Sequence, residues 1–233
     1  MLTRDIKRDV LAATPLFAPL ARDELDILAG LVTERRAARD EMVVHRGDPG
    51  SSLMVLVTGR LRAGAASADG REVTLGLIEP GGVLGEIALL DGQPRSLDVI
   101  AMQDSLLLVV ERTGFLPFLC ARPDLMLRMM GLLCERLRRA STAFEGVALS
   151  PLSARLARLL LELANKYGVP QTGGVRISLK LSQRDMSAQV AATRERVNKQ
   201  LRLWHEAGVL GSQDGHLIIR QPDALRAALD GLD

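Results

Sequence analysis

The run from Gly85 to Ser96 reads Gly-Glu-Ile-Ala-Leu-Leu-Asp-Gly-Gln-Pro-Arg-Ser and is the densest short motif in the chain. Gly85 allows a backbone to approach a ligand closely, and a turn from Gly85 to Ala88 could present backbone N–H groups to an anion. The guanidinium fork of Arg95 suits a phosphate, and Glu86 could accept a hydrogen bond from a sugar hydroxyl. The motif therefore predicts a site for a phosphate-bearing ligand. A plain turn closed by a surface ion pair between Glu86 and Arg95 is the alternative.

Short apolar runs alternate with Gly, Asp and Pro on both sides of this motif, from about Glu41 to Glu111. They are Leu53–Val57, the segment from Leu61 to a turn at Asp69-Gly70, Val73–Ile78 and Leu106–Val110. Many short strands separated by turns are typical of an antiparallel barrel or sandwich. We expect this β domain to occupy residues 1–122, with short helical pieces before it that are interrupted at Pro15 and Pro19.

From Pro123 the apolar period becomes helical. Apolar residues follow one another at alternating spacings of four and three: Met126, Met130, Leu133, Leu137, Ala140, Phe144 and Val147. This narrow heptad stripe predicts a seam between two parallel helices, and hence a homodimer formed through residues 123–149. A helix that packs on the β domain is the alternative.

A third region begins at Ser150-Pro151, which resembles an N-cap followed by proline at the first helical position. We expect a helix from there to about Tyr167 and a strand over Val175–Leu179. Residues 150–233 hold 12 Lys and Arg against 8 Asp and Glu, whereas residues 1–149 hold 18 against 20. The third region is therefore the better candidate for contact with a polyanion.

Two helices joined by a short turn are predicted within this region. Ser182, with Asp185 three residues later, resembles a capping box at the start of the first helix. Thr193 caps the second helix, which runs from Arg194 to about Ala207. This is the geometry of a helix-turn-helix. Predicted strands on both sides of the turn Gly211–Gly215 complete a winged helix-turn-helix.

The second helix carries the side chains that we expect to meet DNA. Val197, Leu201 and Trp204 form its buried face, which leaves polar residues of the kinds that read base edges on the outer face. The first turn of a recognition helix contacts bases. The DNA-binding candidates are Ser182, Thr193, Arg194, Glu195, Asn198 and Lys199. An ordinary amphipathic surface helix is the alternative.

The run Gly85–Ser96 resembles the phosphate-binding cassette of the CRP/FNR family of bacterial transcription regulators. The likeness covers nearly the whole chain, through turn motifs at His45–Asp48, Thr58–Leu61 and Pro80–Gly82, the heptad helix and the helix that starts at Thr193. It implies an α+β fold: an N-terminal antiparallel β jelly-roll that binds a cyclic nucleotide, a long dimerisation helix, and a C-terminal winged helix-turn-helix in residues 150–233.

The resemblance also implies roles for single residues. Arg95 and Ser96 would hold the cyclic phosphate, and Glu86 would take the ribose 2′-hydroxyl. Gly85, Ile87 and Ala88 would line the site, and Leu75 would face the purine. Arg194 and Glu195 match the family's base-reading pair, and Lys199 stands where the third reader is usually Arg. The partners implied are a palindromic DNA operator, a second copy of the chain and RNA polymerase, in the cytoplasm.

Two positions depart from the nucleotide-binding members. Leu97 follows the Arg-Ser pair where Ala is usual, and Ala140-Ser141 replaces the Thr-Ser pair that contacts the purine in the cAMP-responsive prototype. Ser141 could still bond a purine edge. The implied effector is therefore cAMP or cGMP. A same-family regulator that responds to cyclic-di-GMP, to a metabolite or to no effector is the alternative.

Other function classes find little support. The two cysteines lack C-x-x-C spacing and the three histidines are scattered, which argues against a metal site or a disulfide framework. We find no Ser/His/Asp set or paired carboxylates, and so expect neither an enzyme nor a catalytic cofactor. The longest apolar runs are only strand-length, so we expect no membrane span.

Overall fold

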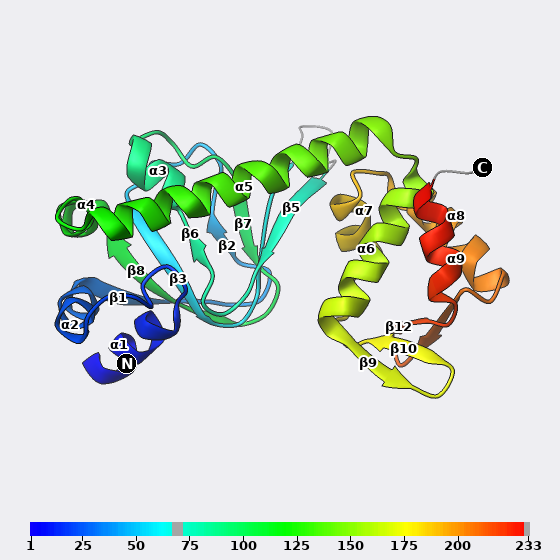
Figure 1. The fold of residues 1–233 in the computed structure, drawn as a ribbon, viewed down its shortest axis with the longest axis horizontal. Helices are drawn as coiled ribbons and strands as arrows, with labels where there is room; N and C mark the ends of the chain where they lie inside the picture. Colours follow the sequence, from blue (N-terminus) through cyan, green and yellow to red (C-terminus); the bar gives the residue numbers. More distant parts are fainter. Residues whose placement is uncertain (67–71, 231–233) are drawn as a thin grey trace. The chain divides into compact units, whose positions relative to one another are not determined.

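The computed structural model describes residues 1–66 and 72–230 (Figure 1). The predicted turn at Asp69-Gly70 lies outside the described residues. The chain divides into two compact units. The first comprises Met1–Ala65 and Leu75–Ala140, and the second is made mostly of the residues from Ser141 onward.

The β domain is confirmed as two four-stranded sheets in the described residues. The strands are β1 (Val32–Ala37), β2 (Met42–Val44), β3 (Ser52–Thr58), β4 (Leu61–Ala66), β5 (Glu72–Ile78), β6 (Val83–Leu84), β7 (Asp98–Ala101) and β8 (Ser105–Glu111). One sheet has the order β1-β8-β3-β6 and the other β2-β7-β4-β5. The pairs of β8 with β1 and β3, of β3 with β6, and of β7 with β2 and β4 are antiparallel.

Strand β3 shows why this sequence forms a layered fold. Successive side chains of a strand point to opposite faces, and β3 is apolar on both. Leu53 and Val55 pack into a core shared with the helices. Met54 and Leu56 pack into a second core with residues of both sheets. The strand is therefore buried on both sides and fixes the sheet between two apolar layers.

Five helices accompany the sheets in the described part of the first unit (Figure 1). They are α1 (Arg4–Ala13), α2 (Arg22–Leu31), α3 (Glu86–Asp91), α4 (Arg112–Cys120) and α5 (Pro123–Leu149). The N-terminal helical pieces are confirmed. Helix α4 was not predicted, because Pro117 lies inside it and breaks the helical pattern. Its Phe115 is fully buried and packs edge-on against Phe17.

Helix α5 presents two apolar stripes. Leu125 and Met129 are buried in the core of the first unit, so the helix does pack on the β domain. The heptad residues Leu137 and Phe144 are 68% and 75% exposed. The stripe predicted to form a seam is thus open along much of its length, while the side chain of Val147 lies outside the described residues.

The second unit is built on one core. Its elements are α6 (Leu152–Tyr167), β9 (Gly168–Gln171), β10 (Gly174–Ile177), α7 (Gln183–Gln189), α8 (Arg194–Glu206), β11 (Leu210–Gln213), β12 (His216–Ile219), α9 (Pro222–Ala227) and the 3₁₀ turn Ala228–Asp230. The sheet order is β11-β12-β10-β9. Strand β9 was not predicted. The cap at Ser150 was wrong by one residue, because Pro151 is extended and itself occupies the N-cap of α6.

The predicted wing is confirmed. Strands β11 and β12 pair antiparallel from Leu210 and Ile219 to Gln213 and His216. Asp214 and Gly215 form the two-residue turn with φ of 52° and 77°. Positive φ at both positions is the requirement of a type I′ hairpin turn, which makes the loop tighter than the five residues expected. None of the described helices has the length and apolar character of a bilayer-crossing segment.

Candidate ligand cassette and nucleic-acid interface

Gly85 precedes a short helix rather than an isolated turn. It adopts φ 87° and forms the N-cap of α3, so the residues read as a turn are the first turn of that helix. A Cβ atom at position 85 would lie 2.5 Å from the carbonyl oxygen of Ser52 and also against the guanidinium of Arg95. Only glycine fits, because it tolerates the left-handed conformation and leaves room for both neighbours.

Arg95 is turned into the protein and is only 7% exposed. Its Nη1 donates to the carbonyl oxygens of Ser52 (2.8 Å) and Gly85 (3.2 Å), and its Nη2 donates to Ser52 Oγ (2.9 Å). Burial lowers the pKa of the guanidinium, which nevertheless stays protonated. Within the described residues these partners are all neutral, so the cation lacks a directly bonded carboxylate.

Glu86 is the second buried charge of the cassette, at 1% exposure. Its Oε1 lies 2.7 Å from Nη1 of Arg136 on α5, but neither carboxylate oxygen accepts a well-aligned hydrogen bond from the described residues. Burial raises the pKa of the carboxyl, and the charge of Arg136 opposes that rise. The alternative of a surface ion pair between Glu86 and Arg95 is wrong, because both are buried and each has other partners.

The sequence did not identify Arg136. It lies off the heptad stripe among several arginines, and nothing in its spacing distinguishes it from them. Its Nη2 also donates to the carbonyl oxygen of Val83. Arg136 thus connects α5 to both β6 and α3. These residues are about 50 positions apart in the sequence and meet only in the folded chain.

The cassette residues surround a cavity of about 50 Å³. All six cassette residues that were predicted to line the site do line it: Gly85, Glu86, Ile87, Ala88, Arg95 and Ser96. Leu97 and Arg136 also form part of its wall. Leu75 is 49% exposed on β5 and is not among the described lining residues. Ser141 is an exposed residue of α5 that belongs to the second unit. The roles of Leu75 and Ser141 stay predictions.

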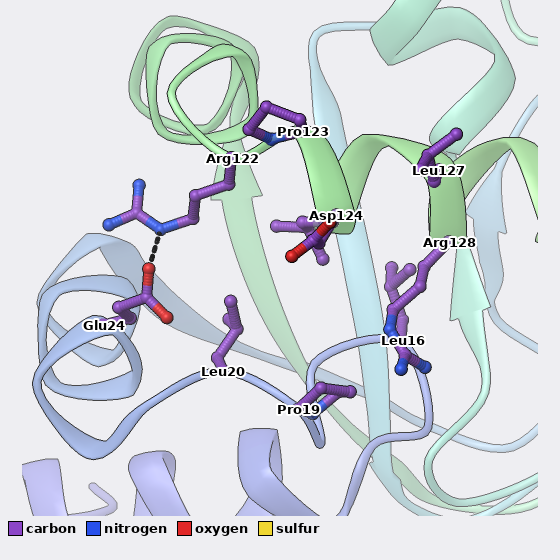
Figure 2. A pocket seen from close by; sticks show the side chains of 10 residues that line it. Leu16, Pro19, Leu20, Glu24, Arg122, Pro123, Asp124, Leu127 and Arg128 are labelled. Atoms are coloured by element: carbon purple, nitrogen blue, oxygen red, sulfur yellow. Dashed lines mark hydrogen bonds and ion pairs between the residues drawn. The ribbon is translucent and has the colours of Figure 1, made fainter.

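A larger cavity of about 530 Å³ lies at the start of α5, away from the cassette (Figure 2). Its wall contains an ion pair in which Nε of Arg122 lies 2.6 Å from Oε1 of Glu24. Arg122 also donates to the carbonyl oxygen of Phe118 and lies over its ring. Charges of both signs line this cavity and Arg122 is already bonded, so its size alone does not make it the better ligand site. Among the described residues no cluster of His, Cys, Asp and Glu could hold a metal ion.

The first helix of the helix-turn-helix begins with the predicted capping box. Ser182 Oγ accepts from the backbone N–H of Asp185 (3.1 Å), and Oδ2 of Asp185 accepts from the backbone N–H of Ser182 (3.0 Å). The Ser182 hydroxyl also donates to the Asp185 carboxylate (2.6 Å). Ser182 is therefore held in place as the cap at the N-terminal end of α7.

The recognition helix α8 starts at the predicted residue. Thr193 Oγ1 accepts from the backbone N–H of Arg196 at 3.4 Å. The predicted buried face is confirmed for Val197, Leu201 and Trp204, and Gly208 follows the helix with φ 71°. The helix is thus anchored through one stripe, which leaves the opposite side of its first two turns open.

The candidate base readers differ in exposure. Arg194, Glu195 and Lys199 are exposed, whereas Asn198 is half-buried. The amide oxygen of Asn198 is buried and has no hydrogen-bond partner in the described part of the chain. The side chains of Arg194, Glu195 and Lys199 are therefore accessible to a ligand, while the amide oxygen of Asn198 is not.

Comparison with known proteins agrees with this arrangement. Residues 34–121 match the cyclic nucleotide-binding domain, and residues 154–228 match the Crp-like helix-turn-helix domain. The CRP-like cAMP-activated global transcriptional regulator of Mycobacterium tuberculosis is 24% identical over 217 residues, covering 93% of this chain and 97% of the relative. The cyclic AMP receptor protein of Thermus thermophilus is 27% identical, covering 94% and 98%.

A solved structure supports the fold alone. The cyclic-di-GMP-responsive global regulator CLP of Xanthomonas campestris has a TM-score of 0.77 at 18% identity, over 85% of this chain and 99% of that chain. The matches are to transcription regulators rather than to enzymes. With a cyclic nucleotide-binding domain followed by a DNA-binding helix-turn-helix of the Crp type, the chain belongs to the CRP/FNR family of transcription regulators.

Proposed function

We propose that this chain is a homodimeric regulator that binds a palindromic DNA operator under the control of a cyclic purine nucleotide, cAMP or cGMP. The observation that carries the proposal is that two buried charged groups, Arg95 and Glu86, line one cavity and that neither has a well-aligned hydrogen bond to an oppositely charged group among the described residues. Arg95 lacks a directly bonded carboxylate among the described residues, and Glu86 lacks a well-aligned donor. A cyclic nucleotide offers a phosphate to the first and a ribose 2′-hydroxyl to the second. Ser96 would add a hydroxyl donor to the phosphate.

Binding requires the cavity to open. Its volume of about 50 Å³ is far below the roughly 300 Å³ of the smaller ligand pockets in proteins. Arg95 would exchange Ser52 for the phosphate, and Glu86 would exchange Arg136 for the sugar. Since Arg136 is part of α5, a ligand that displaces it acts on the helix that carries the heptad stripe. The ligand can shift this equilibrium only by the difference in its affinity for the two states.

The dimer and the operator complete the proposal. The exposed side chains of Met130, Leu137 and Phe144 on α5 would meet their copies in a partner. Two copies of α8 would then read half-sites about 34 Å apart along one face of DNA. Base edges would be contacted by Arg194, Glu195 and Lys199. The helix caps Ser182 and Thr193 would face the sugar-phosphate backbone of the DNA.

The proposal also covers the domain boundaries, the cellular compartment and a further partner. We assign residues 1–122 to the nucleotide domain, 123–149 to dimerisation and 150–233 to DNA binding. The regulator would act in the cytoplasm and contact RNA polymerase. Two similar relatives named for cAMP support the nucleotide class.

A regulator of the same family without a nucleotide effector is the second candidate. The small cavity, the presence of Leu97 in its wall and the three hydrogen bonds of Arg95 to neutral acceptors favour it. In that case the cassette would be a structural corner, and operator affinity would not depend on any cyclic nucleotide.

Calorimetric titration with cAMP, cGMP and cyclic-di-GMP separates the two candidates. We expect one purine nucleotide to bind the wild type, the Arg95→Ala variant to lose that binding, and the exposed control Arg39→Ala to keep it. Operator affinity should rise when the nucleotide is present. Equal operator affinity with and without every nucleotide tested contradicts the proposed control.

A second measurement tests the reading of DNA. The Arg194→Ala variant should lose about 1–3 kcal/mol of discrimination between an operator selected from random sequence and unrelated DNA. If the variant weakens binding to all sequences equally, Arg194 contacts the backbone and does not read a base.

A further inference from the structure

Two arginines of the second unit lie near the starts of two helices, α6 and α8, that pack against each other. Arg155 belongs to the first turns of α6, and Arg196 to the first turn of α8. Their chain neighbours Leu156 and Val197 are fully buried in the same core, where α6 and α8 pack against each other. The guanidinium groups are near enough for the charge of Arg196 to add to the effect of burial in lowering the pKa of Arg155.

This arrangement is unfavourable in the free chain. Nε of Arg155 is buried and has no hydrogen-bond partner among the described residues. Within residues 1–66 and 72–230, neither arginine forms an ion pair with a carboxylate. A buried donor without an acceptor and a pair of like charges both destabilise the fold. An anion placed between the two guanidinium groups would relieve both conflicts.

We propose that Arg155 and Arg196 together hold one phosphate of the DNA backbone beside the base-reading turn of α8. Arg196 is exposed and lies two residues from Arg194, so an anion at this point would be adjacent to the groove that α8 reads. Guanidinium groups match the geometry of phosphate oxygens. Contacts to phosphates fix the position of a protein on DNA without reading its sequence. This inference rests on the proposed binding of DNA.

The salt dependence of DNA binding tests the inference. Each phosphate contact that is lost reduces the slope of log affinity against log salt by about 0.9. Because one phosphate is shared, the double variant Arg155→Ala/Arg196→Ala should lower the slope by about 0.9 and not by about 1.8. Each single variant should weaken binding to the selected operator and to unrelated DNA by the same factor.

Arg158→Ala is the matched control for each single variant, since Arg158 is an exposed arginine of the same helix and its loss also removes one positive charge. It should leave the slope unchanged. If Arg158→Ala lowers the slope as much as the double variant does, the effect is one of general charge and the inference is wrong. An unchanged slope in the double variant also overturns it.

A stability measurement distinguishes the proposed phosphate clamp, formed by Arg155 and Arg196, from a purely structural role of Arg155. Arg155→Met removes the buried unpaired donor but keeps an unbranched, apolar side chain that replaces the methylene part of the arginine. We expect it to unfold at the same or a higher urea concentration than the wild type, followed by the fluorescence of Trp204, while it binds DNA less tightly. A loss of stability equal to the loss of DNA binding contradicts the clamp. If the wild type binds no DNA, the proposed function fails; if only these variants behave as wild type, this inference fails alone.

Discussion

The replacement Gly85→Ala tests whether the cassette depends on a missing side chain. Gly85 has φ 87°, where an alanine is strained by about 1–2 kcal/mol. The new Cβ would also lie 2.5 Å from the carbonyl oxygen of Ser52. Ser52 is paired in register with Glu111 of the neighbouring strand, so that oxygen cannot withdraw without disturbing the sheet.

The steric part adds to the strain. Insertion of a methyl group into a packed site destabilises a protein by about 1–3 kcal/mol. The expected loss for Gly85→Ala is therefore about 2–5 kcal/mol of the free energy of unfolding. Part of it comes from the displacement of Arg95, whose Nη1 bonds to Ser52 and Gly85.

Gly92→Ala provides a matched control at the other end of α3. Gly92 has φ 70°, and the nearest neighbouring atom to a Cβ there is the end of the Arg112 side chain at 3.8 Å. This variant should lose only the strain of about 1–2 kcal/mol. Urea unfolding of both full-length variants, followed by circular dichroism, gives the difference. Equal losses for the two variants would refute the argument that Gly85 is required by close packing.

Three further predictions concern stability. Ala191 has φ 48° in the turn of the helix-turn-helix, so Ala191→Gly should stabilise the second unit by about 1 kcal/mol, measured by urea unfolding with Trp204 fluorescence. A backbone hydrogen bond from Ala21 and the partner Arg122 lower the pKa of Glu24. Glu24→Gln should therefore lower the unfolding midpoint at pH 7, and the difference from wild type should vanish as the pH falls below 4.5 through the folded pKa. Burial raises the pKa of Glu86, so its ionisation destabilises the fold as the pH rises through the raised value. Glu86→Gln should match the wild type at acid pH and exceed its stability at pH 8, and a variant less stable at pH 8 would show that the Arg136 pair outweighs burial.

The sequence was sufficient for the helix-turn-helix because the signals there are local. The cap at Thr193, the glycine at 208 and the spacing of Val197, Leu201 and Trp204 all lie within or beside one helix. The strands of the wing were also predicted from local signals, although its turn is two residues, Asp214-Gly215, and not the five that were expected. Each feature depends on residues a few positions apart, which a single sequence displays directly.

Long-range contacts explain what the sequence did not predict. Strand β9 is paired with β10, and α4 is helical despite Pro117 and buries Phe115 and Leu119. Arg136 becomes a partner of Glu86 only when α5 lies beside α3. None of these pairings leaves a periodic or local trace in the sequence.

The cassette shows a limit of assigning roles to residues one at a time. The chemistry of Gly85, Glu86 and Arg95 predicts an open site for a phosphate-bearing ligand, and the residues do come together. Yet the folded chain already supplies partners to both charged groups. Arg95 donates hydrogen bonds to Ser52, and the guanidinium of Arg136 lies beside the carboxylate of Glu86. A ligand must then compete with the chain's own contacts, which lowers its affinity but gives it something to displace. A ligand that displaces Arg136 would break a contact between α5 and the cassette, and could thereby change the conformation of α5. A ligand that fills an empty, preformed site would break no such contact.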